Sequence, residues 1–264
     1  MSSILVIKCG GSTMEQLPAD FFQAMSELQQ TGHQLVIVHG GGPAINAMLE
    51  KVQITPRFVD GLRYTCEATL EVVEMVLSGS INKQLVRRIS QSGGKAWGMS
   101  GVDGGLITAR QTDRPLGLVG EIVHVESAML GHLLELGYIP VVAPLAVSAD
   151  GQNVYNCNAD VAAGAVAAAL GADKLLMVTD VPGICLPQAD GEMQVKRETD
   201  PAEIDQLIKE GIIYGGMIPK VQSAVDALKQ GVGQVVICRG TASDLRDAVI
   251  GRPVGTAIKS TILQ

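Results

Sequence analysis

A unit of strand, glycine loop and helix occurs twice within the first 52 residues, and it constrains the fold more than any other feature. The first unit opens with ILVIKCGG, residues 4–11, and the second with LVIVHGGG, residues 35–42. Each apolar run is typical of a buried strand, and residues 21–32 and 43–52 have helical patterns, with Pro43 opening the second. Two such units in succession predict parallel strands joined by right-handed crossovers.

The remainder of the chain continues the alternation of strands and helices. Residues 101–126 are rich in Gly, Thr and Val, which predicts an inserted patch of short antiparallel strands or hairpins. The sequence is 47% apolar and 18% charged, a composition typical of sheets that helices cover on both faces. We therefore expect an α/β fold with an antiparallel insertion. A lobe boundary is expected near residues 171–173, where a new strand–helix series begins.

Charge and cysteine usage disfavour several classes of function. The formal net charge of −7 argues against nucleic acid and anionic membranes as partners, so local cations must attract any anionic ligand. The five cysteines form no C-x-x-C motif and the four histidines lack metal-ligand spacing. We therefore expect reduced thiols, a cytoplasmic location and no metal held by protein residues. The first apolar run is too short for a signal peptide, and no run of eighteen apolar residues could span a membrane.

Glycine-rich loops at strand ends indicate an anion site. Ligands of open α/β sheets bind at the carboxyl ends of the strands, where glycine lets backbone N–H groups approach a ligand. Glycines can also serve only for tight turns, but two such loops, one with Lys8 at its base, favour an anion cradle. The familiar nucleotide motifs are absent, since no G-x-x-x-x-G-K-[ST] occurs and Ile45 replaces the last glycine of G-x-G-x-x-G. A Walker-type NTPase and a nicotinamide dehydrogenase are therefore disfavoured.

Two polar stretches supply further candidate ligand groups. Arg63, in FVDGLRYT, could bind a carboxylate or phosphate through two hydrogen bonds, or it could be an ordinary surface residue. In NVYNCNADVAAG, three asparagines and Asp160 precede an Ala-rich helix. Asn158 fits the N-cap of that helix, and Asp160, two positions later, could orient a cation.

A third polar stretch, YGGMIPKVQSAV, places Lys220 in the first turn of a helix whose first position suits Pro219. The helix dipole disfavours a cation there, so an anionic ligand would offset that cost, unless the lysine is simply solvated. Cys9 and Cys157 lie beside the candidate groups. Strand alternation turns Cys9 away from Lys8, and we interpret both thiols as packing residues.

The segment 67–90 predicts one long helix, because apolar residues recur in it with a period near 3.6. Its apolar stripe consists of Leu70, Val73, Leu77, Ile81, Leu85 and Ile89. Three small residues, 78–80, interrupt the segment. Two interpretations stay open, an internal packed helix or a close contact between helices across a dimer.

Six stretches occur in an order that resembles the amino acid kinase family: VIKCGGS, VIVHGGGPAIN, FVDGLRYT, YNCNADVAAG, VTDVPGI and GGMIPK. The resemblance runs from Ile4 to about Ile262. It implies a three-layer αβα sandwich around a central, largely parallel sheet, with a small antiparallel hairpin patch. It also implies two lobes. Residues 1–172 would bind an acyl-amino acid and form the dimer contact, and residues 173–264 would bind ATP. The implied homodimer contact is the helix of residues 67–90.

The resemblance also implies a reaction. The γ-phosphoryl group of ATP would pass to the side-chain carboxylate of N-acetyl-L-glutamate, giving an acyl phosphate in arginine biosynthesis, with Mg²⁺ bound mainly through the ATP phosphates. The implied catalytic residues are Lys8, Lys220, Asp160 and Gly11. Asp160 would orient both lysines, which would stabilise the transferring group. Substrate contacts would come from Gly41, Gly42, Arg63 and Asn156. Nucleotide contacts would come from Gly10, Thr179, Asp180, Gly183, Tyr214, Gly216 and Met217.

Other functions stay open at this point. A related kinase could act on another acid, such as an aminoadipate-type substrate or carbamate, because the pocket side chains decide the acceptor. A sensor of amino acids or nucleotides with the same fold is a further alternative, which the presence of Lys8, Asp160 and Lys220 disfavours. Arginine-inhibited members of the family carry an N-terminal helical extension. Since no helix is expected before Ile4, we expect a dimer without arginine feedback.

Overall fold

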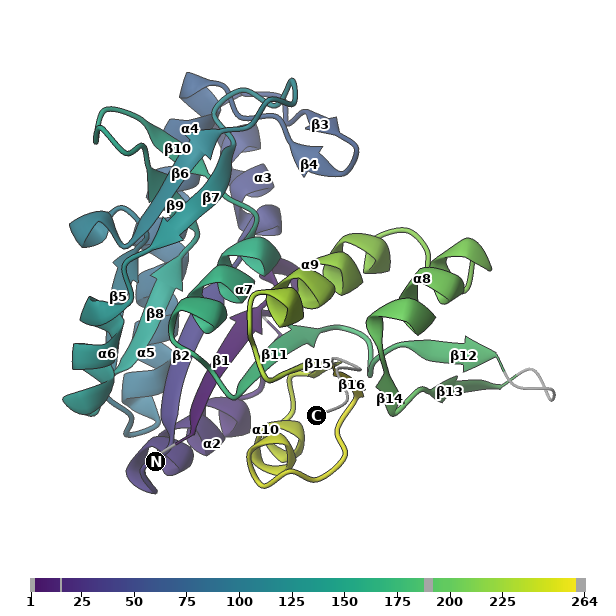
Figure 1. Ribbon diagram of the computed structural model, residues 1–264. Coiled ribbons are helices and arrows are strands. Elements are labelled where there is room, and N and C mark those ends of the chain that lie inside the picture. Colours follow the sequence, from purple (N-terminus) through teal and green to yellow (C-terminus); the bar gives the residue numbers. More distant parts are fainter. Residues whose placement is uncertain (1–2, 15, 188–191, 260–264) are drawn as a thin grey trace.

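The computed structural model describes residues 3–14, 16–187 and 192–259. Its main sheet has the strand order β14-β16-β15-β11-β1-β2-β8-β5 (Figure 1). In that order the strands are Glu198–Thr199, Thr256–Ile258, Gln234–Arg239, Lys174–Thr179, Ile4–Cys9, Gln34–His39, Ile139–Ala143 and Ala96–Ser100. Neighbouring strands are parallel except for β15 and β16. The expected largely parallel sheet is therefore confirmed.

Three smaller sheets complete the strands of the described residues. The four-stranded sheet has the order β10-β9-β6-β7, with strands Val154–Asn156, Leu145–Val147, Ile107–Gln111 and Gly120–Val125. Because β6 and β7 are antiparallel, the patch expected in residues 101–126 is confirmed. Two hairpins project from the body, β3 (Phe58–Val59) with β4 (Leu62–Arg63), and β12 (Cys185–Pro187) with β13 (Met193–Val195).

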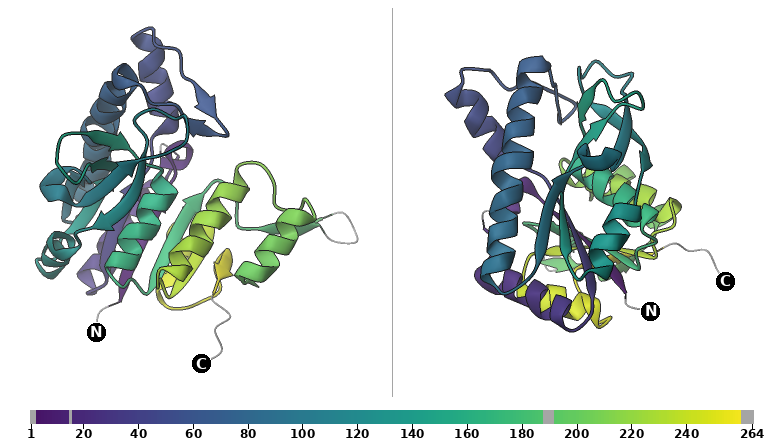
Figure 2. Two further views of the ribbon diagram at one scale, coloured as in Figure 1. Left: turned by 45° about the horizontal axis from the view of Figure 1, so that its top comes forward. Right: turned by 90° about the vertical axis from the view of Figure 1, so that its left-hand side faces the viewer.

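Helices cover both faces of the main sheet, which gives the three layers seen in Figures 1 and 2. One face packs on α6 (Ala128–Glu135), α7 (Ala159–Ala169) and α9 (Met217–Lys229). The other face packs on α2 (Ala19–Gln30), α3 (Gly42–Lys51), α4 (Glu67–Glu74), α5 (Asn82–Gln91) and α10 (Ala242–Val249). On the α7 side, α8 (Pro201–Lys209) adds Ile204 and Leu207 to the core. The other helical segments of the described residues are α1 (Gly11–Met14), a π-helical segment η1 (Met75–Ile81) and a 3₁₀ turn η2 (Asp103–Gly105).

Side-chain alternation along β1 assigns each residue to one of these faces. Leu5, Ile7 and Cys9 belong to the core on the α2 side, whereas Val6 belongs to the core on the α7 side. Lys8 shares the face of Val6, because successive side chains of a strand point to opposite sides. The expectation that Cys9 points away from Lys8 is therefore confirmed.

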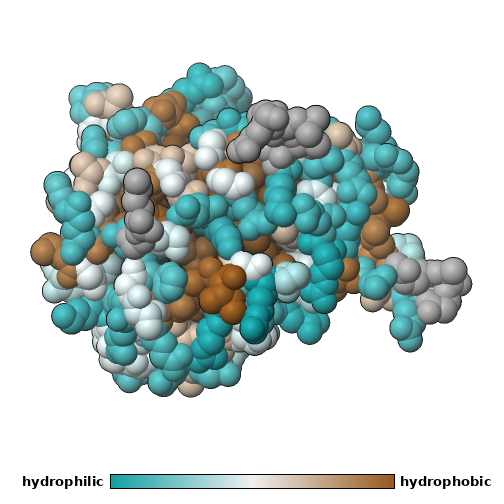
Figure 3. Space-filling view, turned by 60° about the horizontal axis from the view of Figure 1, so that its bottom comes forward, coloured by the Kyte–Doolittle hydropathy of each residue, from teal (hydrophilic) through white to brown (hydrophobic). Residues whose placement is uncertain are grey.

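The expected lobe boundary falls between neighbouring strands of one sheet. β11, the first strand after residue 173, pairs with β1 through Leu5–Lys174 to Cys9–Val178. The division into lobes stays a prediction. On the face shown in Figure 3, hydrophobic side chains lie in scattered patches among hydrophilic ones. No helix in the described ranges combines the length and the apolar character needed to cross a bilayer.

The expected long helix is continuous but is not α-helical throughout. Between α4 and α5 the chain forms a π-helical segment, η1 (Met75–Ile81), and the whole helix runs along one side of the molecule (Figure 2). The three small residues 78–80 lie within η1. A π segment inserts an extra residue into the helical turn, so the register of the apolar stripe shifts locally. Leu77 and Ile81 are nevertheless both buried.

A buried polar contact connects this helix to the second glycine loop. Asn82 is fully buried, and its side-chain Nδ2 donates to the Val141 carbonyl oxygen at 2.8 Å and to the Met99 carbonyl oxygen at 3.1 Å. The same Nδ2 lies 3.2 Å from Nε2 of His39, whose Nδ1 lies 3.1 Å from the Gly40 carbonyl oxygen. These contacts suit a neutral ring with its proton on Nδ1. Burial lowers the pKa of His39 to about 4.

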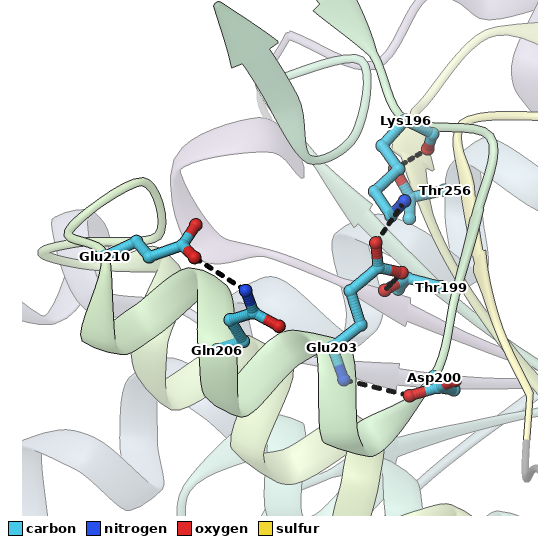
Figure 4. A network of polar contacts seen from close by, with 7 residues as sticks. All are labelled: Lys196, Thr199, Asp200, Glu203, Gln206, Glu210 and Thr256. Atoms are coloured by element: carbon cyan, nitrogen blue, oxygen red, sulfur yellow. Dashed lines mark hydrogen bonds and ion pairs between the residues drawn. The ribbon is translucent and has the colours of Figure 1, made fainter.

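Thr256 joins three segments of the C-terminal half through one fully buried hydroxyl. Its Oγ1 accepts a hydrogen bond from the Ile184 amide at 2.8 Å. The same Oγ1 donates one to the Lys196 carbonyl oxygen at 2.6 Å (Figure 4). Nearby, the Glu203 carboxylate contacts the Lys196 ammonium at 2.7 Å and accepts from the Thr199 hydroxyl at 2.8 Å. These contacts hold β16 against both ends of the β12–β13 hairpin and hold α8 against the chain that follows β13.

Replacing Thr256 by Val should destabilise the fold. The Ile184 amide and the Lys196 carbonyl would both lose a buried partner, which costs about 1–3 kcal/mol for an unsatisfied group. Urea unfolding of the wild type, Thr256→Val and Thr256→Ser measures the effect, with Thr256→Ser as the control that keeps the hydroxyl. Equal stability of the Val variant and the wild type would contradict this account.

The free energy of unfolding should fall as the pH falls from 6.5 to about 4, the interval between the pKa values of His39 in the unfolded and the folded protein. The unfolded chain binds a proton on His39 below the ordinary histidine pKa of 6.5, whereas the folded protein resists protonation down to about pH 4. Acid therefore favours the unfolded state over this window, by roughly 3 kcal/mol for a shift of this size. Urea midpoints at several pH values, compared with those of His39→Gln, measure the contribution. An identical pH dependence in the variant would exclude His39 as its source.

Candidate active site

Two cavities adjoin at the carboxyl end of β1. The β11 cavity, about 460 Å³, lies between the end of β11, the β12–β13 hairpin and the start of α9. The hairpin cavity, about 520 Å³, lies between the start of α3, the β3–β4 hairpin, β7 and the start of α7. Gly10 lines the first cavity, and Lys8 and Gly11 line the second. The carboxyl end of β1 thus borders both spaces, as expected for a ligand site in an open α/β sheet.

Every residue that the sequence singled out as a site residue lines one of the two cavities. The β11 cavity contains Gly10, Thr179, Asp180, Gly183, Tyr214, Gly216, Met217 and Lys220. The hairpin cavity contains Lys8, Gly11, Gly41, Gly42, Arg63, Asn156 and Asp160. The residues expected to contact the nucleotide thus line one cavity, and those expected to contact the substrate line the other. The roles of these residues stay predictions.

Lys8 and Asp160 form a buried ion pair where the hairpin cavity meets β1. The ammonium Nζ lies 2.8 Å from the carboxylate Oδ1, and the two residues are 5% and 8% exposed. Asp160 is the second residue of α7, and Asn158 caps that helix by accepting from the amides of Asp160 and Val161. The expected N-cap is therefore confirmed. The cap fixes the backbone of Asp160, and the ion pair compensates two charges that burial would otherwise disfavour.

Lys220 faces the other cavity and lacks such a partner. Its side chain is half-buried and, within the described residues, makes no ion pair or hydrogen bond with another side chain. Asp160 forms an ion pair with Lys8 but none with Lys220, and the expectation that Asp160 orients both lysines stays a prediction. Pro219 was expected at the first helical position but is the third residue of α9, which begins at Met217. A proline still fits there, since the first helical amides have no intrahelical partner.

The two glycine loops touch each other through their backbones. A Cβ atom on Gly11 would lie 2.7 Å from the amide nitrogens of both Gly41 and Gly42. The Gly40 amide also donates to the Cys9 carbonyl oxygen at 2.9 Å. None of these four glycines has a positive φ. Glycine is therefore needed at these positions because the loops approach each other closely, and not because the backbone adopts the left-handed conformation. These glycines line the hairpin cavity, where a backbone without side chains lets a ligand approach closely, as an anion cradle needs.

The π-helical segment closes the second glycine loop from behind. A Cβ atom on Gly41 would overlap the side chains of Leu77 and Ile81, both of which belong to η1. Leu77 also lines the hairpin cavity. The position of this loop therefore depends on where η1 places its apolar side chains.

Arg63 has one end of its guanidinium group fixed and the other end unpaired. Its Nη2 donates to the Asn46 side-chain oxygen at 2.6 Å and to the Gly42 carbonyl oxygen at 3.3 Å. The Phe58 ring lies against the group, 4.9 Å from its central carbon. Nη1 is buried without a hydrogen-bond partner, and the residue lines the hairpin cavity. Burial lowers the pKa of Arg63, but a guanidinium stays charged at neutral pH.

Cys9 and Cys157 are buried and stay protonated. Burial raises the pKa of Cys9 and that of Cys157 to about 12. Both thiols belong to hydrophobic cores on opposite faces of the main sheet, in line with the interpretation as packing residues. Across the described ranges, no three residues of the types His, Cys, Asp and Glu gather in a way that could hold a metal ion.

Several cavity residues carry no signal in the sequence. Arg114 lines the hairpin cavity and its guanidinium contacts the Asp60 carboxylate of the β3–β4 turn at 2.8 Å. Glu121 lines the same cavity and accepts from the Thr112 hydroxyl at 2.9 Å, a bond that lowers the pKa of Glu121. Met193, on β13, lines the β11 cavity. Hairpin pairing brings these residues to the cavities, and no local motif marks such a position.

Known proteins resemble this chain over its whole length. The sequence profile of the Amino acid kinase family matches residues 3–239. A Brevibacillus brevis protein named acetylglutamate kinase is 62% identical over 262 residues, which make up 99% of each chain. A solved structure from Streptococcus mutans UA159 has a TM-score of 0.84 and 33% identity, covering 98% of this chain and 99% of that one. A Giardia carbamate kinase has a TM-score of 0.71 at 17% identity and the same coverage, a likeness in fold alone.

The family profile spans most of the chain, and the bacterial relative aligns from end to end at high identity. The two adjoining cavities lie at the sheet edge where an α/β fold binds its ligands. The chain belongs to the amino acid kinase family.

Proposed function

We propose that the protein transfers the γ-phosphoryl group of ATP to the side-chain carboxylate of N-acetyl-L-glutamate, giving an acyl phosphate in arginine biosynthesis. The observation that carries this proposal is the arrangement of two cavities, each lined by a lysine, on either side of the β1 loop. ATP occupies the β11 cavity and the acyl-amino acid occupies the hairpin cavity. The name of the Brevibacillus brevis relative supports the choice of acceptor.

The chemistry requires positioning and charge stabilisation, without a general base. A carboxylate is already a nucleophile at neutral pH, but it must approach a polyanionic donor in line. The chain supplies Lys8 on the acceptor side and Lys220 on the nucleotide side. A Cβ atom on Gly10 would lie 3.6 Å from the Lys8 Nζ, so the loop that lines the β11 cavity lies beside the Lys8 ammonium. Both cations and the loop amides stabilise charge on the transferring group.

Arg63 and Asn156 hold the acceptor in this proposal. Arg63 presents its unpaired Nη1 to the carboxylate that does not react. Asn156 already donates to the Thr65 hydroxyl at 3.1 Å, and its amide lines the same cavity. The fixed asparagine can therefore contact the amide region of the acyl group. Gly41 and Gly42 contribute backbone amides at the start of α3, where the helix dipole favours an anion.

The β11 cavity suits a nucleotide with its metal bound mainly through phosphates. Asp180 is the one carboxylate in the described lining, and it accepts from the Thr179 hydroxyl at 2.9 Å. Such a site fits Mg²⁺, which keeps several waters and binds few protein ligands. When bound, Mg²⁺ neutralises phosphate charge. Tyr214, Gly216 and Met217 border the cavity at the start of α9, where they contact the nucleotide.

The assembly and the location are proposed on the same basis. The protein works in the cytoplasm as a homodimer that meets through the helix of residues 67–90. Met75, on the outward side of that helix, is 55% exposed although it is apolar. Residues 1–172 form the acceptor lobe and residues 173–264 the nucleotide lobe. Light scattering in solution would measure the mass of the assembly.

Incubation with Mg-ATP and a panel of acids should give an acyl phosphate with N-acetyl-L-glutamate alone. Hydroxylamine traps an acyl phosphate as a hydroxamate, whose complex with ferric iron is coloured, so the product can be detected. The panel contains N-acetyl-L-glutamate, an acylated aminoadipate, glutamate and carbamate, and omission of Mg²⁺ serves as the control. A signal with another acid would replace the proposed acceptor. No signal with any acid would favour a sensor on the same fold.

Lys8→Ala should lower kcat by on the order of a hundredfold or more, as does the loss of a donor that acts in the transition state. Asp160 would then be buried without its partner, so the variant should also lose stability. Lys8→Ala combined with Asp160→Asn removes both charges and should regain stability but not activity.

Lys259→Ala is the matched control, because Lys259 contacts Glu198 at the surface and lines neither cavity. It should keep wild-type kcat. Comparison of kcat with the unfolding midpoint of each variant separates chemistry from stability. Near-normal kcat in Lys8→Ala would refute the proposed role of Lys8.

A further inference from the structure

We propose that Asn46 is a positioning residue for the acceptor: it holds the Arg63 guanidinium so that Nη1 faces the carboxylate of the substrate. The inference rests on the proposed function, because it concerns the acceptor that the hairpin cavity takes. Asn46 itself does not line either cavity. Its influence on the substrate must therefore pass through the residue that it touches.

The contact between Asn46 and Arg63 joins a rigid element to a weakly supported one. Asn46 is the fifth residue of α3, one turn after Gly42, whose carbonyl oxygen also accepts from Arg63 Nη2. Arg63 belongs to a hairpin of two residues per strand, with Phe58 52% exposed on it. A two-stranded hairpin of this length is marginal by itself. The first turn of α3 therefore supplies the fixed frame for the guanidinium group.

The hydrogen bonds of Arg63 leave one set of donors available. Nη2 carries two N–H groups and has two acceptors, the Asn46 side-chain oxygen at 2.6 Å and the Gly42 carbonyl at 3.3 Å. Nη1 is buried and has no acceptor. A buried donor without a partner is costly, and a carboxylate is the anion whose planar shape suits a guanidinium. Saturation of Nη2 directs the incoming carboxylate to Nη1.

Removal of the side-chain oxygen of Asn46 should weaken the binding of the acceptor selectively. Arg63 would keep only the longer contact to Gly42, and its guanidinium could rotate against the Phe58 ring. Asn46→Leu is the variant of choice because it keeps a similar volume, loses the acceptor and suits a helix. A hydrogen bond to a charged group is stronger than one between neutral groups, so acceptor affinity should fall on the order of tenfold or more.

The experiment compares the wild type, Asn46→Leu, Arg63→Ala and the double variant. Calorimetry with N-acetyl-L-glutamate gives Kd, and steady-state kinetics gives kcat and the KM for each substrate. We expect Asn46→Leu to raise Kd and KM for the acid roughly tenfold, with kcat and the KM for ATP within about twofold of wild type. The double variant should bind the acid no more weakly than Arg63→Ala, because Asn46 acts only through Arg63. Glu50→Ala, at an exposed position of α3, is the control and should match the wild type.

Three results would overturn the inference. Additive losses in the double variant would mean that Asn46 acts independently of Arg63. An equal rise in the KM for ATP would point to a general disturbance of α3. Unchanged affinity for the acid in Asn46→Leu would remove the role altogether. Failure of the proposed function can be told apart from failure of this inference. If the wild type binds the acid but does not phosphorylate it, the proposed function fails, and the Kd values still test the role of Asn46. If the wild type binds no acid, both proposals are overturned.

Discussion

The buried pair of Lys8 and Asp160 fixes the centre of the molecule. Neither charge is tolerable alone at that depth, so the end of β1 and the start of α7 must come together for the chain to fold. Asn158 holds the first turn of α7 in place, and the parallel pairing of β1 with β2 and β11 holds Lys8. The ion pair thus stabilises this arrangement of β1 and α7, and the arrangement in turn keeps the two charged groups in contact. The ion pair also holds Lys8 in the lining of the hairpin cavity, beside the Gly10 backbone that lines the other cavity.

The glycines of the two loops, which carry no side chain, impose a second constraint at the same edge of the main sheet. The loops after β1 and β2 approach so closely that a Cβ atom on Gly11 would enter the backbone of the other loop. Leu77 and Ile81 press on Gly41 from the opposite side, and the buried Asn82 anchors the same helix to β5 and β8. The candidate cradle for the phosphoryl group is therefore enclosed by packed elements, which limits its freedom to change shape.

Local patterns in the sequence were sufficient for much of this arrangement. Repeated strand–glycine–helix units predicted the parallel sheet. The N-cap at Asn158 followed from capping preferences, and the orientation of Cys9 away from Lys8 followed from strand alternation. The π-helical segment was missed because small residues permit it but do not require it, and packing against the Gly41 loop decides the register. Asp160 was expected to reach two lysines, yet motif order carries no distance, and one contact satisfies its charge. Contacts such as Arg63 with Asn46, or Arg114 with Asp60, depend on where the hairpins pack in the folded protein. A short stretch of sequence does not predict that position.

Cys9 follows the proposed catalytic lysine directly, and its burial has a chemical consequence. The thiolate is the form of cysteine that reacts with peroxides and disulfides, and burial raises the pKa of this thiol to about 12. Cys157, near Asp160, is shielded in the same way. The Cys9 and Cys157 thiols should therefore resist oxidants, so that the activity of the protein does not depend on the redox state of its surroundings through these two positions.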